Sequence, residues 1–222
     1  MTSRFVTAQV NRVDALSDNV SRVLLQPPEV VPFAAGQYLQ LCLDNGERRP
    51  YSIACAPGGS ELELHIGASV RDASAIAVIH QLQHSSEATL ELPLGDAWLR
   101  NGREPLLVIA GGTGFSYAKA LIEQTLQEQP TRSITLYWGG RNRDALYLHE
   151  LAESWARHYP QLRYVAVLDE APQGWGGLLG RVHEAVVRHE PALAQHAVYV
   201  AGPFAMAAAA RSAFFAAGLP AH

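Results

Sequence analysis

The chain has 222 residues, which is enough for one large domain or two domains of about 100 residues each. Charged residues make up 17% of it and the formal net charge is −4, so nothing indicates a basic surface for nucleic acid. No apolar stretch approaches the roughly 20 residues of a membrane span, and the N-terminal sequence lacks the apolar core of a secretion signal. We therefore expect a cytoplasmic protein that binds neither nucleic acid nor a membrane.

The cysteines and histidines do not form a metal-binding pattern. Cys42 and Cys55 both lie in apolar, strand-like segments, so we expect them as small buried side chains in a reducing compartment. A plant-type iron–sulfur module needs four cysteines, and the nine histidines show no H-E-x-x-H spacing. The sequence therefore predicts no metal site.

The first part of the chain alternates short β-rich runs with turn residues. A helix is expected where apolar residues recur at helical intervals after Asp72, a candidate N-cap. Asn45 and Gly46, between two apolar runs, predict a β-hairpin. The expected strands are residues 5–10, 20–25, 38–43, 62–66 and 89–92, and the expected helix is residues 73–82. Strands at this spacing favour a small antiparallel β-barrel.

The hairpin is followed by Arg49, Pro50, Tyr51 and Ser52. Proline fixes φ and has no N–H, so Pro50 is expected in a strand at the edge of a sheet. An arginine, an aromatic ring and a hydroxyl would then lie side by side. Taken alone, these residues are more typical of a solvent-facing strand with a bend than of a binding site.

A polar, turn-forming break at residues 101–105 precedes a region in which strands alternate with longer helical segments. We therefore predict two domains, residues 1–101 and residues 102–222. In the second, strands are expected at residues 106–110, 133–138, 162–168 and 197–201, and helices at residues 117–128, 148–158 and 181–189. This alternation indicates a doubly wound parallel α/β sheet, in which ligands bind at the carboxyl ends of the strands.

The first strand of that sheet runs into a glycine-rich turn and then a helical pattern. The turn consists of Gly111, Gly112, Thr113, Gly114, Phe115 and Ser116. A helix N-terminus carries unpaired N–H groups and partial positive charge, so the turn is a candidate site for a dinucleotide pyrophosphate. Tyr117 occupies the third glycine position of G-x-G-x-x-G, so that fingerprint is incomplete. The alternative is a tight strand-to-helix turn without a ligand.

The second strand ends at Gly140 and Arg141, with Arg143 close behind. A conventional NAD site has an acidic residue at this place, whereas two arginines suit the 2′-phosphate of NADPH. A solvated basic loop, or an arginine that meets adenine or pyrophosphate, fits the same residues.

The last strand ends in Gly202, Pro203 and Phe204, which open the final helix and leave its N-terminus clear. Met206 follows within that helix, where we expect it to pack in the core.

Four motifs occur in the order found in the ferredoxin–NADP reductase superfamily, which the chain resembles nearly end to end; they are residues 35–38, 49–52, 111–116 and 201–206. Within that superfamily the chain looks like the small bacterial NAD(P)H-flavin reductases, including those of luminous bacteria. The segments that carry this second resemblance are residues 63–68, 93–100, 114–117 and 137–141.

The resemblance implies a flavin held by the β-barrel, a nicotinamide dinucleotide held by the α/β domain, and hydride transfer between them. By the same resemblance Ser52 is the candidate catalytic residue, because a donor beside flavin N5 stabilises the charge that develops there. The implied flavin-binding residues are Arg49, Pro50, Tyr51, Ser52, His65, Ile66, Gly67 and Ala68. Those implied for the dinucleotide are Gly111, Gly112, Thr113, Gly114, Phe115, Ser116, Gly140, Arg141, Gly202, Pro203 and Phe204.

Three functions are compatible with these features. The first is a monomeric enzyme that reduces free riboflavin, FMN or FAD with NADH or NADPH and passes the reduced flavin to an acceptor such as a flavin-dependent oxygenase. The second is a flavin-retaining reductase component with its iron–sulfur module on a separate chain. The third is a catalytically silent binding subunit. Relatives extend past the last helix, whereas this sequence stops at His222, so either the flavin face is open or the sequence is shortened.

Overall fold

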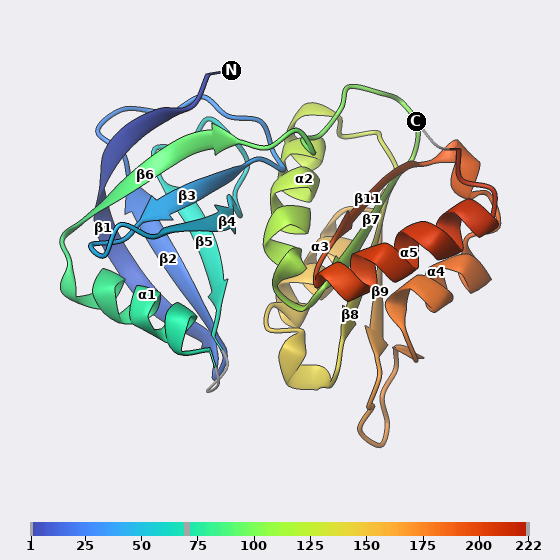
Figure 1. Cartoon of the computed structure of the whole chain (residues 1–222). Coiled ribbons are helices and arrows are strands. Elements are labelled where there is room, and N and C mark those ends of the chain that lie inside the picture. The colour runs from blue at the N-terminus through green and yellow to red at the C-terminus, as the bar shows by residue number, and fades with distance from the viewer. Residues whose placement is uncertain (1, 69–71, 221–222) are drawn as a thin grey trace. The chain divides into compact units, whose positions relative to one another are not determined.

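The computed structural model describes residues 2–68 and 72–220, which form two compact units (Figure 1). The first unit contains residues 2–100 together with Lys119–Gln124, and the second contains Asn101–Ala118 and residues 125–220. The predicted domain limits, residues 1–101 and 102–222, stay a prediction. No helix in the described part of the chain combines the length and the apolar character needed to cross a membrane.

The first unit is built on a six-stranded antiparallel sheet in the order β4-β3-β6-β1-β2-β5. Its strands are β1 (Arg4–Ser17), β2 (Val20–Gln26), β3 (Tyr38–Cys42), β4 (Arg48–Ser52), β5 (Leu62–Gly67) and β6 (Glu87–Leu94). Just beyond β4, an antiparallel bridge joins Ile53 to Leu64 of β5, so the two ends of the strand order approach each other. The predicted antiparallel fold is confirmed, with β4 and its proline at one end of the order.

Local signals account for the turn and the helix of this unit. Gly46 adopts φ 83° in the hairpin between β3 and β4, a conformation that glycine adopts without steric cost. Helix α1 (Ala73–His84) begins after Asp72, whose side chain accepts a hydrogen bond from Ala75 N at 3.0 Å. Cys42 and Cys55, expected to be buried, are free thiols with intermediate exposure. Burial nevertheless raises the pKa of Cys55 to about 11.

The second unit is a five-stranded parallel sheet in the order β10-β9-β8-β7-β11. Its strands are β7 (Leu106–Gly111), β8 (Ile134–Gly140), β9 (Leu162–Leu168), β10 (Leu178–Leu179) and β11 (Ala197–Ala201). Every residue of β7 is buried, as an apolar run at the centre of a parallel sheet requires. The chain moves from β7 to β10 on one side and returns to place β11 on the other, so a topological switch point lies between β7 and β11.

The helices of this region are α2 (Phe115–Glu128), which contributes to both units, α3 (His149–His158), α4 (Val182–His189) and α5 (Phe204–Ala216). Figure 1 shows α4 and α5 on the same face of the parallel sheet. Val186 of α4 and Phe214 of α5 pack there against Tyr137 and Ile109 in one apolar cluster. The doubly wound α/β prediction is confirmed, and the starts of α4 and α5 meet the carboxyl ends of the strands.

Candidate functional site

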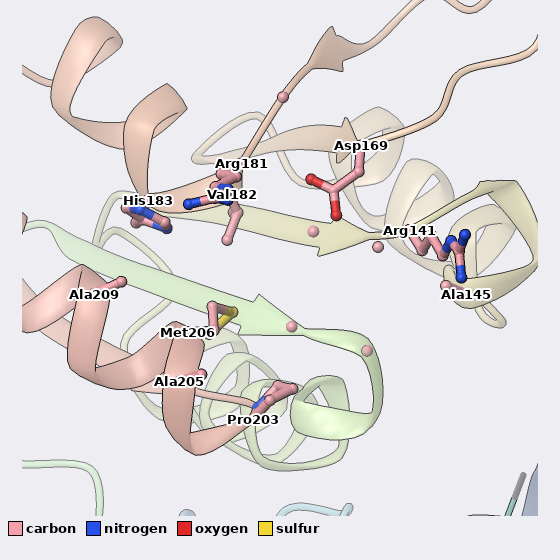
Figure 2. Close-up of a pocket in the computed structure, with 15 residues that line it drawn as sticks. Arg141, Ala145, Asp169, Arg181, Val182, His183, Pro203, Ala205, Met206 and Ala209 are labelled. Atoms are coloured by element: carbon pink, nitrogen blue, oxygen red, sulfur yellow. The ribbon is translucent and has the colours of Figure 1, made fainter.

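A cavity of about 480 Å³ lies at the carboxyl ends of the parallel strands. Its walls come from the ends of β7 and β8, the residue that follows β9, and the first turns of α4 and α5 (Figure 2). Chain segments far apart in sequence therefore meet in one place. The volume falls within the range of pockets that hold small-molecule ligands.

The glycine turn forms one wall of this cavity, and two of its glycines, Gly111 and Gly114, have no room for a side chain. Gly112 adopts φ 51°, and the turn continues as a 3₁₀-helix, Gly112–Gly114, into α2. A Cβ on Gly114 would lie 2.2 Å from the carbonyl oxygen of Ala201. A Cβ on Gly111 would lie 2.3 Å from the Met206 sulfur. These two glycines let the turn pack closely against the last strand and helix. At Gly112, which lines the cavity, a Cβ would meet no atom within 4 Å, so a phosphate can approach the backbone there closely.

Side chains beneath the turn hold its shape. The Trp138 indole Nε1–H donates to the Gly112 carbonyl oxygen at 3.0 Å, and the Ser116 hydroxyl donates to the Thr113 carbonyl oxygen at 2.9 Å. Phe115 is fully buried and stacks on Trp138 with ring centroids 3.8 Å apart. The Phe115 side chain is therefore a support for the turn, and only its backbone faces toward a ligand at the helix start.

The cavity brings together five of the residues expected to bind the dinucleotide; they are Gly111, Gly112, Gly140, Arg141 and Pro203. The others lie in the same turns but not in its lining. Gly202 fits closely beside Gly111, since its own Cβ would lie 3.1 Å from the Gly111 Cα. The Phe204 side chain is 95% exposed at the start of α5. Met206 packs against the apolar core cluster, as expected, and also lines the cavity.

The two arginines near the end of β8 are both engaged with carboxylates. Arg141 Nε lies 3.1 Å from Glu170 Oε1, in an exposed pair. Arg143 contacts Glu150 and lies 3.4 Å from the Leu146 carbonyl oxygen. Of the two, Arg141 lines the cavity.

Three polar residues of the cavity, Asp169, Arg181 and His183, were not predicted from the sequence. Asp169 follows β9 directly, and its N–H donates to the Gly140 carbonyl oxygen at 3.0 Å, which places it beside the end of β8. The sequence contains a signal for Asp169, because it follows the third predicted strand of this sheet. Ligands bind at the carboxyl ends of such strands, the third as well as the second. Arg181 and His183 lie at the start of a predicted helix that follows Gly180. A glycine before a helix start is the same pattern that identified the glycine turn as a candidate ligand site.

In the first unit, the predicted flavin residues of β4 alternate between the two faces of the strand. Tyr51 pairs with Leu39 of β3 and packs against the core, and burial raises its pKa. Ser52 is half-buried and pairs with Tyr38, on the opposite face. Arg49 forms an ion pair with Glu47 at 2.7 Å. The hydroxyl therefore shares its face with Pro50 rather than with the aromatic ring.

The predicted residues of β5 differ in their surroundings. Ile66 is fully buried in the core, Gly67 ends the strand with its backbone exposed, and Ala68 N donates to the Asn19 carbonyl oxygen at 2.8 Å. His65 is also buried, and its Nε2 lies 2.8 Å from Glu63 Oε1.

His65 belongs to a polar cluster that we call the lysine cluster, made of Glu63, His65, Lys119 and Glu123. His65 and Lys119 are buried, and the two carboxylates are partly exposed. Lys119 Nζ lies 2.9 Å from Glu63 Oε2 and 2.9 Å from Glu123 Oε1, and it donates to the Ala54 carbonyl oxygen at 2.9 Å. Burial alone would raise the pKa of Glu63, but the His65 hydrogen bond and the Lys119 charge outweigh it and lower that pKa to about 2. Burial lowers the pKa of His65, which keeps its ring neutral.

Known proteins resemble the chain along most of its length. Residues 108–212 match the oxidoreductase NAD-binding domain family. The NAD(P)H-flavin reductase of Vibrio harveyi is 39% identical over 216 residues, covering 94% of this chain and 91% of that protein. Reductase component 2 of terephthalate 1,2-dioxygenase from a Comamonas species is 34% identical over 212 residues, covering 93% of this chain and 63% of that protein. Among solved structures, the Amycolatopsis cytochrome P450 reductase GcoB matches with a TM-score of 0.90 at 28% identity, covering 98% of this chain and 67% of that one.

Proposed function

Because the chain belongs to the NAD(P)H-flavin reductase family, we propose that it transfers a hydride from NADH or NADPH to riboflavin, FMN or FAD and releases the reduced flavin. The bound rings supply the chemistry, which moves a hydride from nicotinamide C4 to flavin N5. The protein's contribution is to bind and orient the two substrates. We place this reaction in the cytoplasm, in a monomer, with a flavin-dependent oxygenase as one class of acceptor for the product.

The cavity of the second unit is the observation that carries this proposal. The bare backbone of Gly112 lines the cavity with open space beside it and leads into the N-terminus of α2, which suits a pyrophosphate. Pro203 and the start of α5 adjoin that turn. A nicotinamide ring would fit there, beside the switch point between β7 and β11. The residues present therefore fit a dinucleotide.

Asp169 bears on the choice between the two coenzymes. A carboxylate beside the adenosine ribose accepts hydrogen bonds from the ribose hydroxyls and repels a 2′-phosphate. Asp169 lines the cavity, while the charge of Arg141 is shared with Glu170. We therefore propose that NADH is used more efficiently than NADPH, although the two arginines suggest tolerance of NADPH.

Ser52 is proposed as the catalytic donor near flavin N5, in accord with the relatives' motif and its half-buried place at the end of an edge strand. Replacing one preorganised donor lowers rates by about ten- to a thousandfold, so Ser52→Ala should reduce the rate of flavin reduction within that range. Ser60→Ala, at an exposed serine of the same unit, is the matched control and should react like the parent. An unchanged rate in Ser52→Ala would remove Ser52 from the reacting edge.

The decisive experiment records the absorbance of the purified protein and then its NADH and NADPH consumption with each flavin. A nearly colourless protein that consumes NADH only when flavin is added supports the proposal. A yellow protein that retains one flavin per chain favours the second candidate, a reductase component, which the match to a dioxygenase reductase also fits. No turnover with any flavin, together with stable binding of another protein, would point to a silent subunit.

A further inference from the structure

Two exposed histidines lie next to each other on the last two turns of α1. His80 and His84 are four residues apart, so their side chains share one face of the helix, and their ring centroids are 4.2 Å apart with an interplanar angle of 27°. Both line an open groove of about 670 Å³ between α1 and the hairpin that joins β3 to β4 (Figure 1). The residues of this groove belong to the first unit, and none of them lines the cavity assigned to the dinucleotide.

A hydrogen bond to the backbone fixes the proton on one ring nitrogen of His84. Its Nδ1 lies 2.8 Å from the His80 carbonyl oxygen. A carbonyl oxygen only accepts, so Nδ1 carries the hydrogen and donates it, and Nε2 keeps its lone pair. Histidines that bind metal ions usually hold their second ring nitrogen in this way, through an N–H donated to a backbone carbonyl or a carboxylate. His84 therefore presents the nitrogen that a metal ion requires.

Comparison with two other histidines shows what is particular to His84. His158 and His196 make the same bond, from Nδ1 to the carbonyl oxygen four residues earlier, at 2.7 Å and 2.9 Å. By itself, such a bond only satisfies a carbonyl oxygen at the end of a helical segment. Ser154 and Ala192 occupy the position four residues earlier in those two cases, whereas His84 has a second imidazole there. Among these three histidines, His84 alone belongs to a pair.

The two rings of the pair suit one ion held between them. Two bonds of about 2.0–2.1 Å at a tetrahedral angle place the nitrogen ligands of Zn²⁺ about 3.4 Å apart. Centroids 4.2 Å apart are close to that arrangement, and because both side chains are exposed, small rotations bring the nitrogens together. Asp44 borders the same groove, where its Oδ1 lies 3.2 Å from Nε2 of Gln81. Its carboxylate adds negative charge beside the position of the cation.

We propose that His80 and His84 together bind one divalent transition-metal ion of the kind that prefers imidazole, such as Zn²⁺, Ni²⁺ or Cu²⁺. The described residues contain no group of three or more His, Cys, Asp or Glu side chains that could hold a metal ion, so water fills the remaining coordination positions. Such a site needs only H-x-x-x-H on a helix, and therefore lacks the longer ligand patterns of closed metal sites. Because its two ligands lie on consecutive turns, the ion stabilises the C-terminal half of α1.

Calorimetric titration of the whole chain with ZnCl₂ tests the site. The loss of even an outer-shell partner weakens metal binding about 10–100-fold, so His80→Ala and His84→Ala should each bind Zn²⁺ at least about tenfold more weakly than the parent. His80→Ala leaves the carbonyl oxygen that His84 contacts in place, so it removes a ligand without removing the backbone bond. The matched control is His158→Ala, at an exposed histidine with the same backbone bond but no neighbouring imidazole, and it should bind like the parent.

Copper supplies a second readout. The electron paramagnetic resonance spectrum of the parent with one equivalent of Cu²⁺ should show two nitrogen ligands, and both single variants should lose that signal. Unaltered Zn²⁺ affinity in either His80→Ala or His84→Ala would overturn the inference, as would a parent that binds neither ion. A loss of affinity in His158→Ala equal to that in the two variants would also overturn it. These measurements contain no flavin or coenzyme, so their outcome is separate from that of the proposed function.

Discussion

Lys119, in the lysine cluster of the first unit, and His183 of the second unit are both buried and polar, but their partners differ. In the cluster, Lys119 meets Glu63, Glu123 and a backbone carbonyl oxygen, each at 2.9 Å. His183 has a buried Nδ1 without a partner among the described residues, and it borders a cavity. The difference teaches that burial alone does not assign a role. A satisfied polar group fixes the protein's own backbone, whereas an unsatisfied one leaves the cost of its burial uncompensated.

The strongest way to break this comparison is to remove the lysine. Lys119→Met leaves two partly buried carboxylates without their cation, and the free energy of unfolding should fall by up to the about 3–5 kcal/mol that a fully buried unpaired charge costs. Urea denaturation measures this loss. Arg4→Ala, which removes the cation of an exposed pair with Glu29 in the same unit, should cost less than about 1 kcal/mol. Equal effects of the two variants would show that the lysine cluster does not stabilise the fold.

Acid should weaken the same cluster in a defined range of pH. The pKa of Glu63 in the folded protein is about 2, below its ordinary value of 4.5, so protons bind the unfolded chain more readily. The stability that Glu63 contributes is therefore complete above about pH 4.5 and is lost as the pH falls through about 2. Urea denaturation at several pH values should show a shallower loss in Glu63→Gln than in the parent across this window. Parallel curves would contradict the assigned pKa.

The smallest change in the free energy of unfolding is expected for a variant of His183, the unpaired group in this comparison. His183→Leu removes an unpaired polar group and replaces it with an apolar side chain, so the free energy of unfolding should stay within about 1 kcal/mol of the parent or rise. The same urea measurement tests this expectation. A loss of about 2 kcal/mol or more would mean that the imidazole stabilises the protein itself, which would bring it into the same class as Lys119.

Much of the fold was predictable because its signals are local. The strands expected at residues 162–168 and 197–201 coincide with β9 and β11, and Asp72 caps α1 as expected. The first strand was predicted as residues 5–10, but β1 extends to Ser17. Its register shifts beyond Val10, and the polar residues that follow do not continue the apolar alternation. Strand β10 has two residues, held by pairing with β9, and carries no periodic signal of its own.

The candidate site was predictable where one segment makes it and not where several segments meet. Gly112 and Gly114 were found because a strand, a glycine turn and a helix follow each other in sequence. Asp169 joins them through the pairing of β8 with β9, which is a property of the folded sheet. His183 falls within an ordinary amphipathic helical pattern. Its lack of a partner exists only in three dimensions, so no sequence pattern could reveal it.

β4 ends the strand order, and only the single bridge from Ile53 to Leu64 joins its far end to β5, so the rest of its outer edge has no strand partner among the described residues. Pro50 lies at the middle of that strand and offers no amide hydrogen to an incoming strand. Arg48 and Arg49 precede it, and each is already paired with a carboxylate, Glu91 and Glu47 respectively. Pro50 therefore limits strand addition at this edge, within the segment that the proposed function assigns to the flavin.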